Sequence, residues 1–158
     1  MNKSEWDIAN ALTCPRRGIF PFRRYLVVPN VSWGFNLNFE CDLIIASNSK
    51  VLYEVEIKVS KSDIKRDMSK HRHLMYKPNA HIKHKYFAIP SNLNEESVLE
   101  MIPEKCGIII VDENGRCKKI RKAETNPDYR KITEKEWCAL LRLGVMRYWG
   151  IRHKMYNN

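Results

Sequence analysis

The segment from Val51 to Val59 alternates between two kinds of residue, and this alternation restricts the fold more than any other feature of the sequence. Its odd positions are all apolar, whereas positions 54, 56 and 58 are Glu, Glu and Lys. Successive side chains of a β-strand point to opposite faces, so the pattern predicts a strand with one apolar face and one charged face. Ionised groups that face a protein interior are costly unless they are paired or bind a metal ion. The charged face therefore needs partner residues or a cation.

A second strand is predicted from Phe39 to Ala46, and the polar turn at residues 47–50 would join the two strands as a hairpin. A strict two-residue turn would place Asp42 beside Val55. A three-residue or bulged connection would instead place Asp42 opposite Glu56. We expect the longer connection, because it brings two carboxylates together on one side of the hairpin.

These carboxylates, with a lysine two residues further along the same strand face, have the composition of a divalent-metal phosphodiesterase site. Mg²⁺ prefers oxygen ligands and usually takes one or two carboxylates together with water and substrate phosphate. Asp42, Glu56 and the backbone carbonyl of Ile57 could supply such ligands to Mg²⁺ or Mn²⁺. Lys58 could hold the attacking water and offset charge in the transition state. Glu54 is a possible outer ligand or general base.

This arrangement resembles the signature of the restriction-endonuclease-like PD-(D/E)XK superfamily, which here would be Asp42, thirteen residues, and then Glu56-Ile57-Lys58. The segments EIKVSKSDIKRD, HKYFAIP and CGIIIVDENGR are also similar to consecutive segments of its MmcB-like DNA-repair branch and of small phage proteins. Cys41 stands where the superfamily usually has the proline of its name. The resemblance implies a restriction-endonuclease-like core and a nuclease that acts on double-stranded or branched DNA, in DNA repair or phage DNA processing.

In the superfamily, an acidic residue on the first helix can complete the metal site. Ser4 to Thr13 is predicted to be a helix with Ser4 as its N-cap, and Glu5 is the candidate by position. The alternative is that Glu5 is a first-turn acid that suits the helix dipole.

Length and charge agree with a single nucleic-acid-binding domain. The chain has 158 residues, of which 44% are hydrophobic, enough for one domain with a substantial core. Its 28 Lys and Arg outnumber 18 Asp and Glu, and the net charge of +10 favours a polyanionic partner such as DNA. A soluble protein that happens to be basic would show the same balance.

Two basic segments are candidates for contacts with the DNA backbone. A helix predicted from Ser60, its N-cap, to about Tyr76 carries Lys61, Lys65 and Lys70. Arg16 and Arg17 precede an alternation of arginines and aromatic residues that can bind phosphates and stack on bases. The alternative is that the lysines only solvate the helix and that the aromatic residues only anchor a loop to the core.

The remaining pattern predicts an α/β fold with a mixed central sheet flanked by helices. Further strands are expected at residues 25–33, 84–90, 107–111 and 116–122, and a helix at residues 95–105. Thr133 would cap a basic C-terminal helix that ends at about Lys154. This helix either docks onto the domain through one apolar stripe or serves as a DNA-groove or dimer helix. The stripe consists of Trp137, Leu140, Leu141, Val145 and Tyr148.

The five scattered cysteines contain no CxxC pair, and the sequence has neither a signal-peptide pattern nor an apolar run long enough to span a membrane. We therefore expect reduced thiols and a cytoplasmic location without membrane contact. The sequence predicts a metal-dependent endodeoxyribonuclease, which could form a homodimer. The alternative functions are a catalytically inactive module of the same fold that binds nucleic acid, and a protein in which these charges form structural ion pairs.

Overall fold

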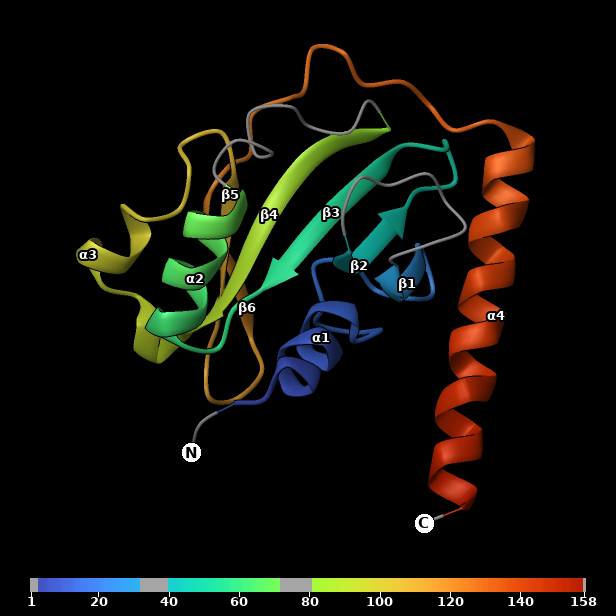
Figure 1. The fold of residues 1–158 in the computed structure, drawn as a ribbon, viewed down its shortest axis with the longest axis horizontal. Coiled ribbons are helices and arrows are strands. Elements are labelled where there is room, and N and C mark those ends of the chain that lie inside the picture. Colours follow the sequence, from blue (N-terminus) through green and yellow to red (C-terminus); the bar gives the residue numbers. More distant parts are fainter. Residues whose placement is uncertain (1–2, 32–39, 72–80, 158) are drawn as a thin grey trace.

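A computed structural model describes residues 3–31, 40–71 and 81–157 of the chain. Within these ranges six strands form one sheet, and their spatial order follows their order in the chain (Figure 1). The strands are β1 (Leu26–Val31), β2 (Cys41–Ala46), β3 (Leu52–Ile57), β4 (Ile82–Pro90), β5 (Gly107–Val111) and β6 (Cys117–Arg121). β1, β2 and β3 are antiparallel neighbours, β4 and β5 run parallel to β3, and β6 is antiparallel to β5. The predicted mixed sheet is confirmed.

Helices cover both faces of this sheet. In the described ranges they are α1 (Glu5–Thr13), α2 (Lys61–His71), α3 (Glu96–Leu99) and α4 (Glu134–Tyr156), with a short 3-10 turn, η1, at Ser91–Leu93. Ile8 of α1 packs in one apolar cluster with Ala88 of β4, whereas Ile64 of α2 packs in another with Phe87. Because neighbouring residues of a strand point to opposite faces, α1 and α2 lie on opposite sides of the sheet.

The β2–β3 hairpin has the three-residue connection that the sequence predicted. The backbone N–H of Ser47 donates to the carbonyl of Val51 at 3.0 Å, which leaves residues 48–50 as the loop. Lys50 closes the loop with a positive φ of 63°. A three-residue hairpin loop requires such a left-handed residue at its end, so the turn sets the register of both strands.

The register places the two predicted carboxylates opposite one another. Leu43 pairs with Val55, and continuing this antiparallel pairing by one residue on each strand sets Asp42 of β2 against Glu56 of β3. Directly opposite residues of an antiparallel pair project to the same face, so this register, continued by one residue, would set Asp42 and Glu56 on one face, which a two-residue turn would have prevented.

The helix predicted at residues 95–105 is wrong in its length. Only Glu96–Leu99 is α-helical, after the short turn η1. Pro103 lies within the predicted range, and proline lacks the N–H that would continue a helix. The predicted first helix and its Ser4 cap are confirmed. The predicted ends of two elements, at Trp33 and Tyr76, lie outside the described residues.

The C-terminal helix α4 begins where predicted and lies beside β1 (Figure 1), but it docks with a different face. Leu140 and Leu143 are buried, whereas Leu141, Val145 and Tyr148 of the predicted stripe are exposed. Gly144 faces β1 as well, because a Cβ at this position would lie 3.4 Å from Val28. No helix in the described ranges combines the length and apolar character needed to cross a bilayer.

Candidate active site

A strip of charged side chains divides the apolar core on the face of the sheet that carries α2. One cluster on this face contains Ile44 and packs against α4, and the other contains Phe87 and packs against α2. Glu54 lies between Ile44 of β2 and Lys85 of β4 in the sheet, and Glu56 lies beside Phe87. Glu54 and Glu56 are both buried, so the charged face predicted for β3 is an interior face.

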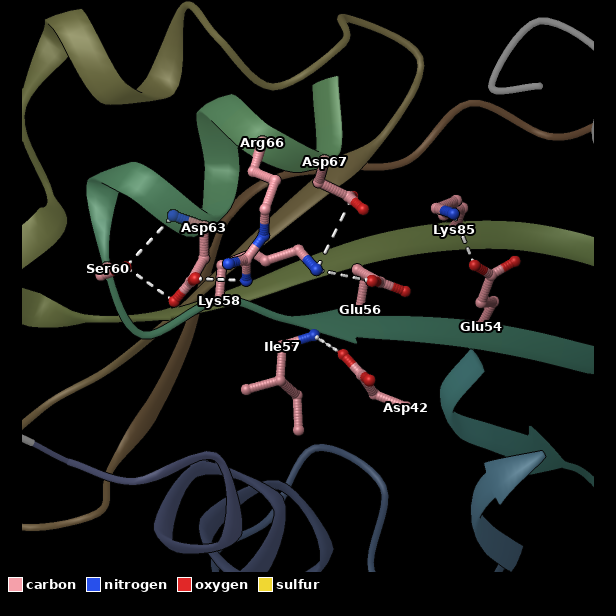
Figure 2. A network of polar contacts seen from close by, with 10 residues as sticks. All are labelled: Asp42, Glu54, Glu56, Ile57, Lys58, Ser60, Asp63, Arg66, Asp67 and Lys85. Atoms are coloured by element: carbon pink, nitrogen blue, oxygen red, sulfur yellow. Dashed lines mark hydrogen bonds and ion pairs between the residues drawn. The ribbon is translucent and has the colours of Figure 1, made fainter. Parts of the chain in front are cut away.

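Asp42 turns its carboxylate toward the end of β3. Its Oδ2 accepts a hydrogen bond of 2.7 Å from the backbone N–H of Ile57 (Figure 2). Burial raises the pKa of Asp42, although this hydrogen bond and the nearby Lys58 charge lower it, while the charges of Glu5 and Asp67 raise it further. The charges of Lys58, Glu5 and Asp67 therefore all act on the Asp42 carboxylate.

Glu56 and Lys58 form a close ion pair at the same place. Lys58 Nζ lies 2.7 Å from Glu56 Oε1 and 3.7 Å from Oδ2 of Asp67 on α2. Burial and then the charge of Asp42 raise the pKa of Glu56 to about 7, despite the opposing charges of Lys85 and Lys58. Burial alone would lower the pKa of Lys58, but Glu56 and Asp67 raise it above its usual value, so the ammonium group stays charged.

The backbone around Ile57 is held from both sides. Its N–H points toward β2, where Asp42 accepts it, and the next N–H, that of Lys58, donates to the carbonyl of Ala88 in β4 at 3.0 Å. The N–H and C=O of a trans peptide point in opposite directions. Since the Lys58 N–H points toward β4, the Ile57 carbonyl points toward the β2 side, where Asp42 lies.

Helix α2 carries Asp67 to Lys58, and its first residues explain why the helix starts where it does. Ser60 Oγ accepts a hydrogen bond of 3.1 Å from the Asp63 N–H and lies 2.6 Å from the Asp63 carboxylate. This N-cap was predicted. Ile64 is fully buried, which fixes the face of α2 that rests on the sheet and places Asp67, three residues later, near β3. We did not predict a role for Asp67, although its helical spacing from Ile64 was a usable signal.

Removing the cap of α2 should destabilise the protein modestly. Ser60→Ala leaves the Asp63 N–H without its acceptor, and the free energy of unfolding should fall by about 1 kcal/mol in urea denaturation. Ser60→Thr keeps the hydroxyl group and should lose much less. Equal losses in the two variants would mean that the hydroxyl group does not cap the helix.

Glu54 is engaged by a lysine that sequence reasoning missed. Lys85 Nζ lies 2.5 Å from Glu54 Oε1, and the Glu54 residue has only 2% of its surface exposed. Burial would lower the pKa of Lys85, but the charges of Glu54 and Glu56 raise it, so the ammonium group stays charged. Glu54 is thus the partner of a buried lysine. Lys85 could not be assigned to it from the sequence, because the pairing depends on the parallel register between β3 and β4.

The remaining predicted site residues are dispersed. Lys61 lies 3.1 Å from Ser97 Oγ and 3.6 Å from Glu95 Oε2, so it links α2 to the α3 region. Lys65 is exposed on α2, and the side chain of Lys70 lies outside the described part of the structure. Arg16 and Arg17 are exposed in the turn after α1. Glu5, on the first turn of α1, acts on Asp42 through its charge.

The donor set fits a hard divalent cation only with help from the backbone and water. Among the described residues, no group of three His, Cys, Asp or Glu side chains could hold a metal ion. Asp42 and Glu56 supply two carboxylates, and the Ile57 carbonyl faces the same side. This is the composition that Mg²⁺ accepts, because it keeps several waters and needs one or two carboxylates.

Comparisons with known proteins identify a shared fold. No family model matches the sequence, and no curated protein matches it either. Among solved structures, the chain is similar to the SPO1766 protein of unknown function from Silicibacter pomeroyi, with a TM-score of 0.63 and 13% sequence identity. The match covers 98% of this chain and 92% of that protein. At this identity the likeness shows the fold alone.

Proposed function

We propose that this protein is a metal-dependent nuclease that hydrolyses DNA phosphodiester bonds. One observation carries the proposal: Lys58 Nζ lies 2.7 Å from the carboxylate of the buried Glu56 at the end of β3, where Asp42 accepts the backbone N–H of Ile57. Burying the carboxylates of Asp42 and Glu56 near each other is unfavourable unless a cation binds to them. Membership of the PD-(D/E)XK superfamily, with the DNA-repair or phage role it implies, is part of this proposal.

Each residue then has a defined task. Asp42, Glu56 and the Ile57 carbonyl hold Mg²⁺ or Mn²⁺, with Glu5 as a possible additional ligand. The divalent ion supplies Lewis-acid polarisation of the phosphate and lowers the pKa of bound water. Lys58, which lies 2.7 Å from Glu56 and 3.7 Å from Asp67, would orient the attacking water. Its positive charge also offsets the negative charge that grows on the phosphate in the transition state.

The charge distribution favours DNA as the substrate. The net charge is +10, and the edge strand β6 carries the exposed lysines Lys118 and Lys119. Phosphate contacts by such residues give affinity without sequence preference. A cytoplasmic location agrees with the five cysteines, none of which forms a disulfide in the described ranges. A homodimer remains a further part of the proposal.

The proposal is tested by incubating purified protein with labelled linear, circular and branched DNA in the presence of Mg²⁺, Mn²⁺ or EDTA. We expect metal-dependent cleavage that falls by about 100-fold to 1000-fold in Lys58→Ala. Asp42→Asn should lose the response to metal while it keeps the fold. Glu113→Gln, a substitution in the exposed turn before β6, is the matched control and should cleave like the wild type.

Two other outcomes would assign a different function. Binding to DNA that weakens steeply with salt, without cleavage under any metal, would indicate a binding module of this fold. Absence of both cleavage and salt-dependent binding would mean that Glu56, Lys58 and Asp67 form a structural ion-pair network.

A further inference from the structure

A cluster of aromatic rings lies on the other face of the sheet, away from the Glu56 carboxylate. Tyr53 of β3 and His84 of β4 are direct neighbours in the register, and their ring centroids are 5.7 Å apart. Phe20 lies 5.9 Å from Tyr53, 5.7 Å from Tyr25 and 6.0 Å from Tyr86. Phe20 and Tyr86 are buried, whereas Tyr25, Tyr53 and His84 are only half-buried. The cluster thus has a buried base and an accessible rim.

The rings of Tyr25, Tyr53 and His84 stay half-exposed on the face of the sheet that carries α1. Residues of α1 pack with the apolar residues near the end of β3, including Ile57. Tyr53 lies four residues earlier, about 13 Å along an extended strand. The segment that follows α1 reaches the cluster through Phe20, and Thr125 Oγ1 lies 2.9 Å from His84 Nε2 at the rim. Its next residues, Phe22, Arg23 and Arg24, are exposed.

Lysines surround this rim. Burial and then the charges of three lysines lower the pKa of His84. Lys83 lies on β4, Lys119 lies on β6, and Lys122 directly follows β6. Lys119 Nζ lies 4.7 Å from the centroid of the Tyr86 ring and 3.3 Å from the Tyr86 hydroxyl. Packing accounts for the buried rings, but it does not account for like charges gathered around the accessible ones.

Unpaired nucleic-acid bases bind well to aromatic faces that are flanked by positive charge. Bases stack on such rings while neighbouring cations contact the phosphates, and this recognition tolerates any sequence. A duplex keeps its bases stacked on one another, so it cannot use the rings. An acidic peptide would satisfy the lysines but would leave the rings without a role.

We propose that this surface, formed by Tyr25, Tyr53, His84, Lys119 and Lys122, binds a single-stranded segment of nucleic acid. The half-buried rings stack on bases, and the two exposed lysines contact phosphates. The surface is separate from the proposed metal site, because the side chains of Tyr53 and Glu56 project from opposite faces of β3. Binding here requires neither the metal nor Glu56, so the inference goes beyond the proposed cleavage chemistry.

The test measures binding by fluorescence anisotropy in EDTA, where no metal-dependent cleavage can occur. The probes are labelled oligo(dT), an abasic oligomer of the same length, and a duplex of the same length. The wild type should bind oligo(dT) at least about 5-fold more tightly than the abasic oligomer, since a stacked base contributes that much or more. Tyr53→Leu should reduce this preference, because it removes the ring and keeps an apolar side chain.

A charge-reversal pair separates this surface from a general effect of net charge. Lys119→Glu with Lys122→Glu should weaken oligo(dT) binding at least about 10-fold and reduce its salt dependence, because two phosphate contacts are lost. Lys135→Glu with Arg142→Glu changes the charge equally at exposed positions of α4 and should have a much smaller effect. The inference is overturned if both pairs weaken binding equally, if abasic and base-containing oligomers bind alike, or if the duplex binds as tightly as oligo(dT).

Discussion

Replacing Glu56 with Gln is expected to abolish metal-dependent cleavage and, at the same time, to make the metal-free protein more stable above pH 7. Cleavage should fall by about 1000-fold, because the neutral amide is a poor ligand for a hard cation. Stability should rise because the substitution removes a buried carboxylate whose ionisation is opposed by burial and by Asp42. A gain of stability on loss of activity distinguishes a residue kept for function from one kept for folding.

The pH dependence follows from the direction of the pKa change. Folding raises the pKa of Glu56 from 4.5 to about 7, so the folded state binds this proton more tightly than the unfolded chain. The stabilisation from this proton is therefore complete below pH 4.5 and is lost as the pH rises through 7. The amide of the Glu56→Gln variant does not ionise. The stability difference between the variant and the wild type should grow by up to about 3 kcal/mol between about pH 4.5 and about pH 8.

Urea denaturation of both proteins across this pH range measures the effect. Mg²⁺ or Mn²⁺ should raise the melting temperature of the wild type and leave that of Glu56→Gln unchanged, because a ligand stabilises only the state that binds it. Glu113→Gln should behave like the wild type in both measurements. A stability difference that does not vary with pH would show that Glu56 ionises normally in the fold, and the argument for a cation site would fail.

Replacing Lys85 with Met should cost about 3 to 5 kcal/mol of the free energy of unfolding. The substitution leaves Glu54 buried without the ammonium group that lies 2.5 Å from it. Removing one partner of a buried ion pair is strongly destabilising, because the other charge loses its compensation.

The double variant Glu54→Gln with Lys85→Met is the informative comparison. It removes both charges, and its stability should be much closer to that of the wild type than the stability of Lys85→Met alone. Lys118→Met, on the exposed edge strand β6, is the matched control and should change stability by less than about 0.5 kcal/mol. A loss below about 1 kcal/mol in Lys85→Met would mean that the pair contributes little to holding β3 against β4.

The central hairpin could be predicted from the sequence because its information is local. The two-residue period of Val51 to Val59 fixes the faces of one strand, and the length of the loop at residues 48–50 fixes its register against the other. These two facts were enough to bring Asp42 and Glu56 together and to place Lys58 beside them.

What could not be predicted depends on contacts between distant segments. Lys85 joins the charged strip only because β4 lies parallel to β3 in one register, which no local pattern sets. The docking face of α4 was ambiguous because Leu140 and Leu141 are neighbours and both are apolar. Leu140 and Leu143 pack in the cluster that contains Val28, so the docking face depends on the position of β1.

The two hydrogen bonds that hold the backbone around Ile57 also affect how strongly a cation could bind. Asp42 restrains the peptide before Ile57, and Ala88 restrains the peptide after it. The carbonyl oxygen is thus oriented before any ion arrives, and little conformational entropy remains to be lost on binding. Oδ2 of Asp42 already accepts this hydrogen bond, which leaves the other oxygen of the carboxylate as the better placed ligand. Such a site favours a small ion with strict geometry over a larger one that needs bidentate ligands.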